Sequence, residues 1–187
     1  LVTGIESVTN VGGSDALRSA GVYTVQGTGG PSRNISNATQ TNPVILTVND
    51  HRLLSGSLIG ISSVTGMTEL NGNRYYVDVV TENTVALYTD STLLTSVDGT
   101  GFTAYTSGGT TSGGGATFEI TVDGTGAASV SVAKCGQGYT SGDTITVIDA
   151  DLGNGGAVDL TFDVNAVLGG SLGEGVHNNY IYKLDLR

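Results

Sequence analysis

Short alternating runs of apolar residues, separated by Gly, Asn, Asp and Ser, fill most of this chain. The segments AASVSVA (127–133) and DTITVI (143–148) alternate residue by residue, which is the period of a strand with one buried face. Such runs recur about every 8–12 residues, and most of their apolar residues are β-branched or otherwise compatible with strands. The pattern predicts an all-β protein.

Two segments near the C-terminal end resemble each other: GGATFEITV (114–122) and GGAVDLTFDV (155–164). Between them, DGTG (123–126) predicts a hairpin turn, because Asp-Gly tolerates positive φ. We expect a four-stranded antiparallel unit over 113–164. The predicted inward residues are Phe118, Ile120 and Val122 in the first segment and Leu160, Phe162 and Val164 in the second.

Composition shifts divide the chain into three parts. PSRNISNATQTN (31–42) is polar and predicts a linker, and GGTTSGGG (108–115) is rich enough in glycine to predict a flexible joint. Residues 42–107 therefore form a predicted small β-barrel module. The module is either inserted into, or flanked by, a Gly-rich antiparallel β domain. In the inserted arrangement, the N-terminal β segment and linker (1–41) pair with 108–187, which ends in a C-terminal strand.

The phrase VTGMTELNGN (64–73) joins two strands of this module. Thr-Gly and Asn-Gly supply turn chemistry. Met67 and Leu70 are the apolar residues of its interior, and we expect them to fold back as a small buried plug. This role is structural and needs no catalytic side chain.

The same stretch resembles a recurring module of phage and prophage virion proteins. Those modules run from a strand through HGL-x-x-G to V-x-GM-x-x-LNG, Y-x-V and F-x-L, although this chain has Arg52 where Gly usually follows His51. The module is similar to a small β-barrel half-domain (FCCH) named in ubiquitin-activating enzymes; the likeness implies the fold and not ubiquitin chemistry. The matching positions are Val64, Gly66, Met67, Leu70, Asn71, Gly72, Tyr76, Val77 and Leu87.

A second resemblance covers 113–147, which is similar to a glycine-rich repeat common in structural proteins of marine and cyanobacterial phages. Together the two resemblances imply a structural protein of the virion, most readily tail- or fibre-associated. They imply other virion proteins as partners. Because phage appendages are symmetric assemblies, the two resemblances also imply a homo-oligomer, by analogy a trimer. A capsid decoration protein and an adhesin-like module that binds host surface glycan are the alternatives.

Charge and hydropathy narrow the function classes. The 17 Asp and Glu against 7 Lys and Arg give a net charge of −10, which argues against a nucleic-acid partner. No segment of about 18 apolar residues is present, so we expect no membrane span. The first residues, LVTGIESVTN, show no signal-peptide pattern. The chain begins with Leu rather than Met, which is compatible with a fragment or a processed product.

No catalytic set stands out in the sequence, and we expect neither an enzyme nor a cofactor. His51 adjoins Asp50, and neighbours on a strand cannot face one another as a Ser-His-Asp triad requires. The single cysteine, Cys135, has Lys134 beside it on the opposite strand face, which favours an unreactive thiol. The acids are scattered, and nothing marks out a pair for glycoside hydrolysis.

The segment IDADLGNGG (148–156) contains the best metal candidates. Asp149, Asp151 and Asn154 offer oxygens around a glycine turn, which is the ligand chemistry of calcium. The segment lacks a closing Glu at the right distance, and turns rich in Asp and Asn are common without a metal. A plain turn is therefore the favoured interpretation.

The C-terminal segment NNYIYKLDLR (178–187) alternates strongly. A terminal strand of this kind closes its own sheet or pairs with a neighbouring subunit. The candidate contact face carries Tyr180, Tyr182, Leu184 and Leu186.

Overall fold

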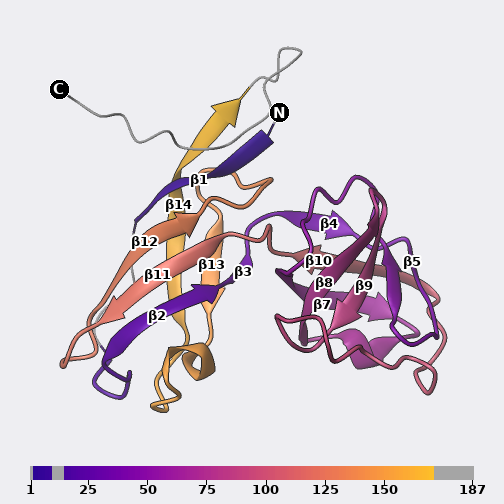
Figure 1. Cartoon of the computed structure of the whole chain (residues 1–187), viewed down its shortest axis with the longest axis horizontal. Coiled ribbons are helices and arrows are strands. Elements are labelled where there is room, and N and C mark those ends of the chain that lie inside the picture. Colours follow the sequence, from indigo (N-terminus) through magenta and orange to yellow (C-terminus); the bar gives the residue numbers. More distant parts are fainter. Residues whose placement is uncertain (1, 10–14, 171–187) are drawn as a thin grey trace.

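The computed structural model describes residues 2–9 and 15–170, and this part of the chain is all-β, as predicted. The strands build two lobes that lie side by side (Figure 1). The flanking lobe contains the strands nearest both ends of the described chain. The inserted lobe contains the strands between them, from Ser32 to Ser112, and extends beyond the predicted bounds of 42–107 at both ends.

The flanking lobe consists of two antiparallel sheets, with the strand orders β12-β11-β2 and β1-β14-β13-β3. The short helix η2 follows β13. The elements are β1 (Val2–Thr9), β2 (Gly21–Gln26), β3 (Thr28–Gly29), β11 (Thr117–Val122), β12 (Ala128–Lys134), β13 (Thr144–Val147), η2 (Asp149–Leu152) and β14 (Leu160–Gly170).

The core of the flanking lobe lies between its two sheets. Phe118 of β11 meets Phe162 of β14 edge to face, with ring centroids 4.9 Å apart. All six residues predicted to point inward are buried. The single four-stranded unit expected over 113–164 is wrong in its pairing: β11 and β12 belong to one sheet, and β13 and β14 to the other. An N-terminal strand takes the edge of β13 that pairing with β12 would need, because β3 pairs with β13.

The inserted lobe is one strongly curled antiparallel sheet with the order β4-β10-β7-β8-β9-β6-β5 and its own buried core. The phrase 64–73 includes the short helix η1. The elements are β4 (Ser32–Asn34), β5 (Asn37–Ala38), β6 (Ile45–Thr47), β7 (Ser57–Thr65), η1 (Thr68–Leu70), β8 (Arg74–Thr81), β9 (Thr84–Tyr88) and β10 (Ser107–Ser112).

The stretch 31–42 is part of this sheet and is not the linker that its polarity predicts. Its strands β4 and β5 lie at the two edges of the sheet and are separated only by Ile35 and Ser36. Ile35 N–H donates to Gly109 O and Ser36 N–H donates to Thr47 O, both at 2.9 Å. One short chain segment therefore joins the two edges, which closes the curled sheet.

The phrase 64–73 closes one end of the inserted lobe. Met67 and Leu70 are fully buried, as predicted for an apolar plug. The Asn71 side chain accepts a hydrogen bond from Val64 N–H (2.8 Å) and donates one to Val64 O (2.9 Å). Gly66 has φ +89°, and a Cβ there would lie 2.2 Å from Ala104 O, so this position requires glycine.

Three turns share an Asp-x-Thr pattern in which one carboxylate oxygen accepts both the backbone N–H and the hydroxyl of the Thr two residues later. These hydrogen bonds favour the ionised carboxylate, so the Thr hydroxyl first lowers the pKa of each Asp. The next largest contribution is the N–H of the same Thr for Asp98 and Asp123, and the N–H of Thr95 for Asp90. The pairs are Asp90 with Thr92, Asp98 with Thr100, and Asp123 with Thr125 in the predicted DGTG hairpin.

The described residues include no helix that is both long enough and apolar enough to cross a membrane.

Candidate functional site

The chain passes between the two lobes twice, at Gly30–Pro31 and at 113–115. The two passages contact each other, because Gly113 N–H donates to Pro31 O at 3.2 Å. Glycines 113, 114 and 115 are buried, and a Cβ on Gly114 would lie 2.2 Å from Gln137 O. The predicted flexible joint at 108–115 therefore consists of β10 followed by glycines that are packed too closely for any side chain.

Tyr139 lies beneath both passages and is fully buried. Its phenolic oxygen accepts hydrogen bonds from Gly114 N–H (3.0 Å) and Ala116 N–H (3.3 Å). A Cβ on Gly30, Gly114 or Gly136 would lie 2.7 Å from a carbon of the Tyr139 ring, so three glycines make room for this ring. Burial raises the pKa of Tyr139, which keeps the phenol neutral.

Gln26, at the end of β2, connects the lobes a second time. Its side-chain Nε2 donates to Gly56 O at 2.7 Å, and its Oε1 accepts from Leu58 N–H at 2.9 Å. Both ends of the amide are therefore used to hold the start of β7 against β2. The Gln26 side chain therefore donates one hydrogen bond to the backbone at the start of β7 and accepts one from it, as the backbone of a neighbouring strand does within a sheet.

Arg74 of β8 and Asp151 of η2 make a third connection. Arg74 Nη1 lies 2.7 Å from Asp151 Oδ2, and Nη2 lies 3.3 Å from Oδ1. The pair is partly exposed, so it contributes little free energy, but its paired geometry restricts the relative position of β8 and η2. Together with Tyr139 and Gln26, it fixes the orientation of one lobe against the other.

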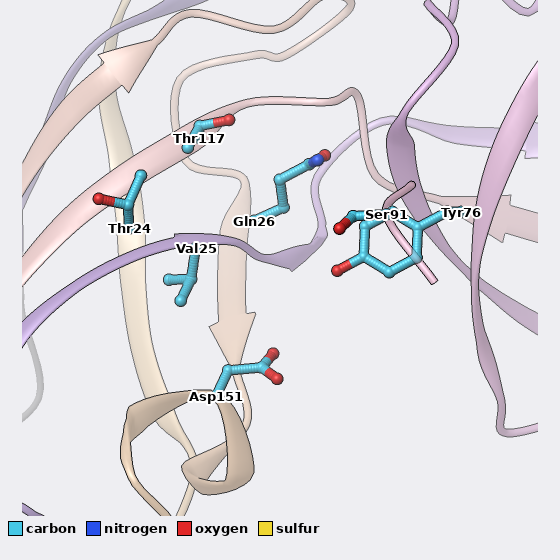
Figure 2. Close-up of a pocket in the computed structure, with 7 residues that line it drawn as sticks. All are labelled: Thr24, Val25, Gln26, Tyr76, Ser91, Thr117 and Asp151. Atoms are coloured by element: carbon cyan, nitrogen blue, oxygen red, sulfur yellow. The ribbon is translucent and has the colours of Figure 1, made fainter. Parts of the chain in front are cut away.

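A cleft of about 260 Å³ lies between these connections (Figure 2). From the flanking lobe it is lined by Thr24, Val25, Gln26, Thr117 and Asp151. From the inserted lobe it is lined by Tyr76 and Ser91. The carboxylate of Asp151 and the phenol of Tyr76 approach the same space from opposite lobes.

The cleft offers polar groups that the fold does not use. Within the described part of the chain, the side-chain hydroxyls of Tyr76, Ser91 and Thr117 have no hydrogen-bond partner. Burial raises the pKa of the Tyr76 phenol, and the negative charge of Asp151 raises it further, while Arg74 lowers it. Tyr76 is therefore a neutral hydroxyl that can both donate and accept a hydrogen bond.

The three candidate calcium ligands, Asp149, Asp151 and Asn154, do not point toward a common position. Asp149 closes its own loop, because its Oδ2 accepts from Gly156 N–H at 2.8 Å; its Oδ1 is buried without a partner. Asp151 turns toward Arg74, and Asn154 is exposed with φ +52°. Among residues 2–9 and 15–170, no group of three or more His, Cys, Asp or Glu side chains is placed to hold a metal ion.

His51 is part of the structure of the inserted lobe. Leu53 N–H donates to its Nδ1 at 3.0 Å, and its Nε2 donates to Thr81 O at 2.8 Å, which uses both ring nitrogens. Asp50 pairs with Arg52 at 2.7 Å instead of with His51. Arg52 has φ +54°, the backbone region that glycine adopts most easily, at the position where the resembling modules carry Gly.

The sequence predicted the motif residues as structural, and one of them also lines the cleft. Val64, Met67 and Leu70 are buried, but Tyr76 is partly exposed and reaches the space between the lobes. Its position in an alternating strand gave no sign of this, because the opposite wall comes from another lobe. The proposed contact face at Tyr180, Tyr182, Leu184 and Leu186 lies outside the described residues.

Comparison with known proteins adds no relative, since no protein-family model and no curated protein matches this chain. The site is therefore described by its geometry alone: a polar cleft between two β lobes that three separate connections hold in one orientation.

Proposed function

We propose that this chain is a non-enzymatic structural component of a bacteriophage virion, tail- or fibre-associated. The observation that supports this most is the triple connection between the lobes through Tyr139, Gln26 and the Arg74–Asp151 pair. A protein whose role is to hold neighbours at fixed positions needs a rigid shape more than it needs reactive groups. The likeness of 42–107 and 113–147 to modules of phage structural proteins supports the same role.

The proposed assembly is a homo-oligomer, with a trimer favoured by the symmetry of phage appendages, in contact with other virion proteins. Location on the capsid surface, as a decoration protein, is the alternative within the same class. Both locations use the lobes as a scaffold.

The experiment is to look for the chain in purified particles of the phage or prophage that encodes it. Particles banded on a density gradient are analysed by mass spectrometry, and antibodies against the protein are located on them by electron microscopy. We expect the chain in stoichiometric amount, with label on the tail or fibres. Its absence from washed, infectious particles contradicts the proposal, and label on the head supports the decoration alternative.

A second candidate function is recognition of host surface glycan. The cleft favours it, because Tyr76, Ser91 and Thr117 direct unused hydroxyls into one space. A glycan array with the full-length protein separates this candidate from a purely architectural role.

A further inference from the structure

We propose that the cleft between the lobes binds one ring of a neutral saccharide. The inference rests on the second candidate function, recognition of glycan, and it holds or fails whether or not the chain is part of a virion. It names a site and a ligand class, and it rests on the side chains that line the cleft.

The first argument is the supply of hydrogen-bonding groups. Unpaired polar groups that face a common space are satisfied by water or by a ligand that carries matching groups. Tyr76, Ser91 and Thr117 each contribute a hydroxyl without a partner in the described chain, and each hydroxyl both donates and accepts. A sugar carries vicinal hydroxyls with the same dual capacity, so it can pair with several of these groups at once.

The second argument is the carboxylate of Asp151. An ionised carboxylate has about four acceptor positions, and Arg74 occupies one on each oxygen. The remaining positions are free to accept hydroxyl donors, and hydrogen bonds to a charged acceptor are stronger than neutral ones. Because Arg74 holds the carboxylate in place, Asp151 is oriented before a ligand arrives.

The third argument is the apolar part of the wall. The Tyr76 ring lines the cleft, whereas the Val25 side chain, on the face of β2 opposite Gln26, packs against the core of the flanking lobe. A sugar ring presents C–H groups on its faces as well as hydroxyls at its edge. A rigid, amphipathic tyrosine suits such a surface, because it offers an apolar face together with a polar end.

Size and charge define the ligand further. The volume of about 260 Å³ lies just below the roughly 300–1,000 Å³ typical of pockets for drug-sized ligands, so it fits one ring. The chain carries a net charge of −10, and Asp151 faces the cleft. Acidic sugars are therefore disfavoured, and a neutral ring is expected.

Full-length, ¹⁵N-labelled protein provides the test. The probes are the methyl glycosides of glucose, galactose and N-acetylglucosamine, with N-acetylneuraminic acid as the acidic probe, each titrated to about 20 mM, which detects millimolar dissociation constants. We expect at least one neutral glycoside to shift the amide signals near Gln26, Tyr76 and Thr117. Tyr76→Phe and Thr117→Val should each weaken binding roughly 3- to 10-fold, the effect of losing one hydrogen bond.

Thr121→Val is the matched control, because Thr121 lies on the same strand as Thr117, is exposed, and does not line the cleft. It should leave the affinity unchanged. The ¹H–¹⁵N spectrum of each variant shows whether it is folded. The proposal is overturned by shifts that are absent for every neutral probe, by shifts away from the cleft, by a preference for the acidic sugar, or by equal loss of affinity in Thr117→Val and Thr121→Val.

Discussion

Removal of a single oxygen atom, by Tyr139→Phe, should destabilise the connection between the lobes. The variant keeps the ring that fills the space left by Gly30, Gly114 and Gly136. It leaves two buried N–H groups, those of Gly114 and Ala116, without an acceptor.

The magnitude follows from these two groups. Each buried donor that loses its partner costs about 1–3 kcal/mol. The bond to Ala116 is the longer of the two, at 3.3 Å against 3.0 Å, so it contributes at the lower end. We expect the free energy of unfolding to fall by about 2–4 kcal/mol. With a urea slope of about 2 kcal/mol/M, the midpoint should fall by about 1–2 M.

Urea denaturation of the full-length protein measures this loss, and hydrogen exchange locates it. The amides of Gly114 and Ala116 should lose protection. Tyr23→Phe is the control, because its hydroxyl donates a single, partly buried hydrogen bond to Ser19 O, and its loss should cost about 0.5–1.5 kcal/mol. A loss in Tyr139→Phe no greater than in Tyr23→Phe, with both amides still protected, would refute the reasoning.

Four further predictions concern the core, pH, metal ions and assembly. Met67→Ala should cost about 2–5 kcal/mol of unfolding free energy by urea denaturation, because Met67 is fully buried, whereas exposed Thr68→Ala should cost far less; equal effects would contradict the apolar plug. The pKa of Asp123, like those of the other two Asp-x-Thr turns, is lowered in the folded state from 3.8, so the stability it provides is present above about pH 4 and is lost as the pH falls further. The melting temperature should therefore drop as the pH falls below about 4, and Asp123→Asn should reduce the size of that drop; an unchanged drop would argue against the role of this turn. A chelator should leave the melting temperature unchanged, and a fall of many degrees that Asp151→Ala abolishes would show a calcium site. Deletion of 178–187 should disrupt assembly, measured by sedimentation, more than it destabilises the inserted lobe, and a full-length protein that stays monomeric at high concentration counts against assembly.

The local pattern of apolar and polar residues was enough to predict several strands and turns of this protein. Alternation over 127–133 and 143–148 predicted strands that the structure contains as β12 and β13, because a period of two depends only on neighbouring residues. The same holds for the DGTG turn, which joins β11 and β12 as predicted, although its positive φ is at Gly126 and not at the Asp-Gly pair, and for the buried pair Met67 and Leu70. Turn chemistry and the burial of an apolar residue within a polar phrase are both local properties, so the sequence alone was enough to predict them.

The partners of the strands were decided only by the tertiary structure. Alternation specifies which face of a strand is buried, but it does not specify which strand lies beside it. The polar stretch 31–42 therefore looked like a linker, although β4 and β5 within it pair with β10 and β6. The glycines at 113–115 looked flexible, because their close packing against Leu58, Gln137 and Ser57 depends on residues more than twenty positions away.

The cleft is the clearest case of a feature that sequence could not show. Its walls come from Gln26, Tyr76, Ser91, Thr117 and Asp151, which lie far apart along the chain and belong to two lobes. None of these residues is unusual in its own segment. They form a site because the two passages of the chain, the Gln26 amide and the Arg74–Asp151 pair hold the lobes in one orientation, and that orientation is a property of long-range contacts.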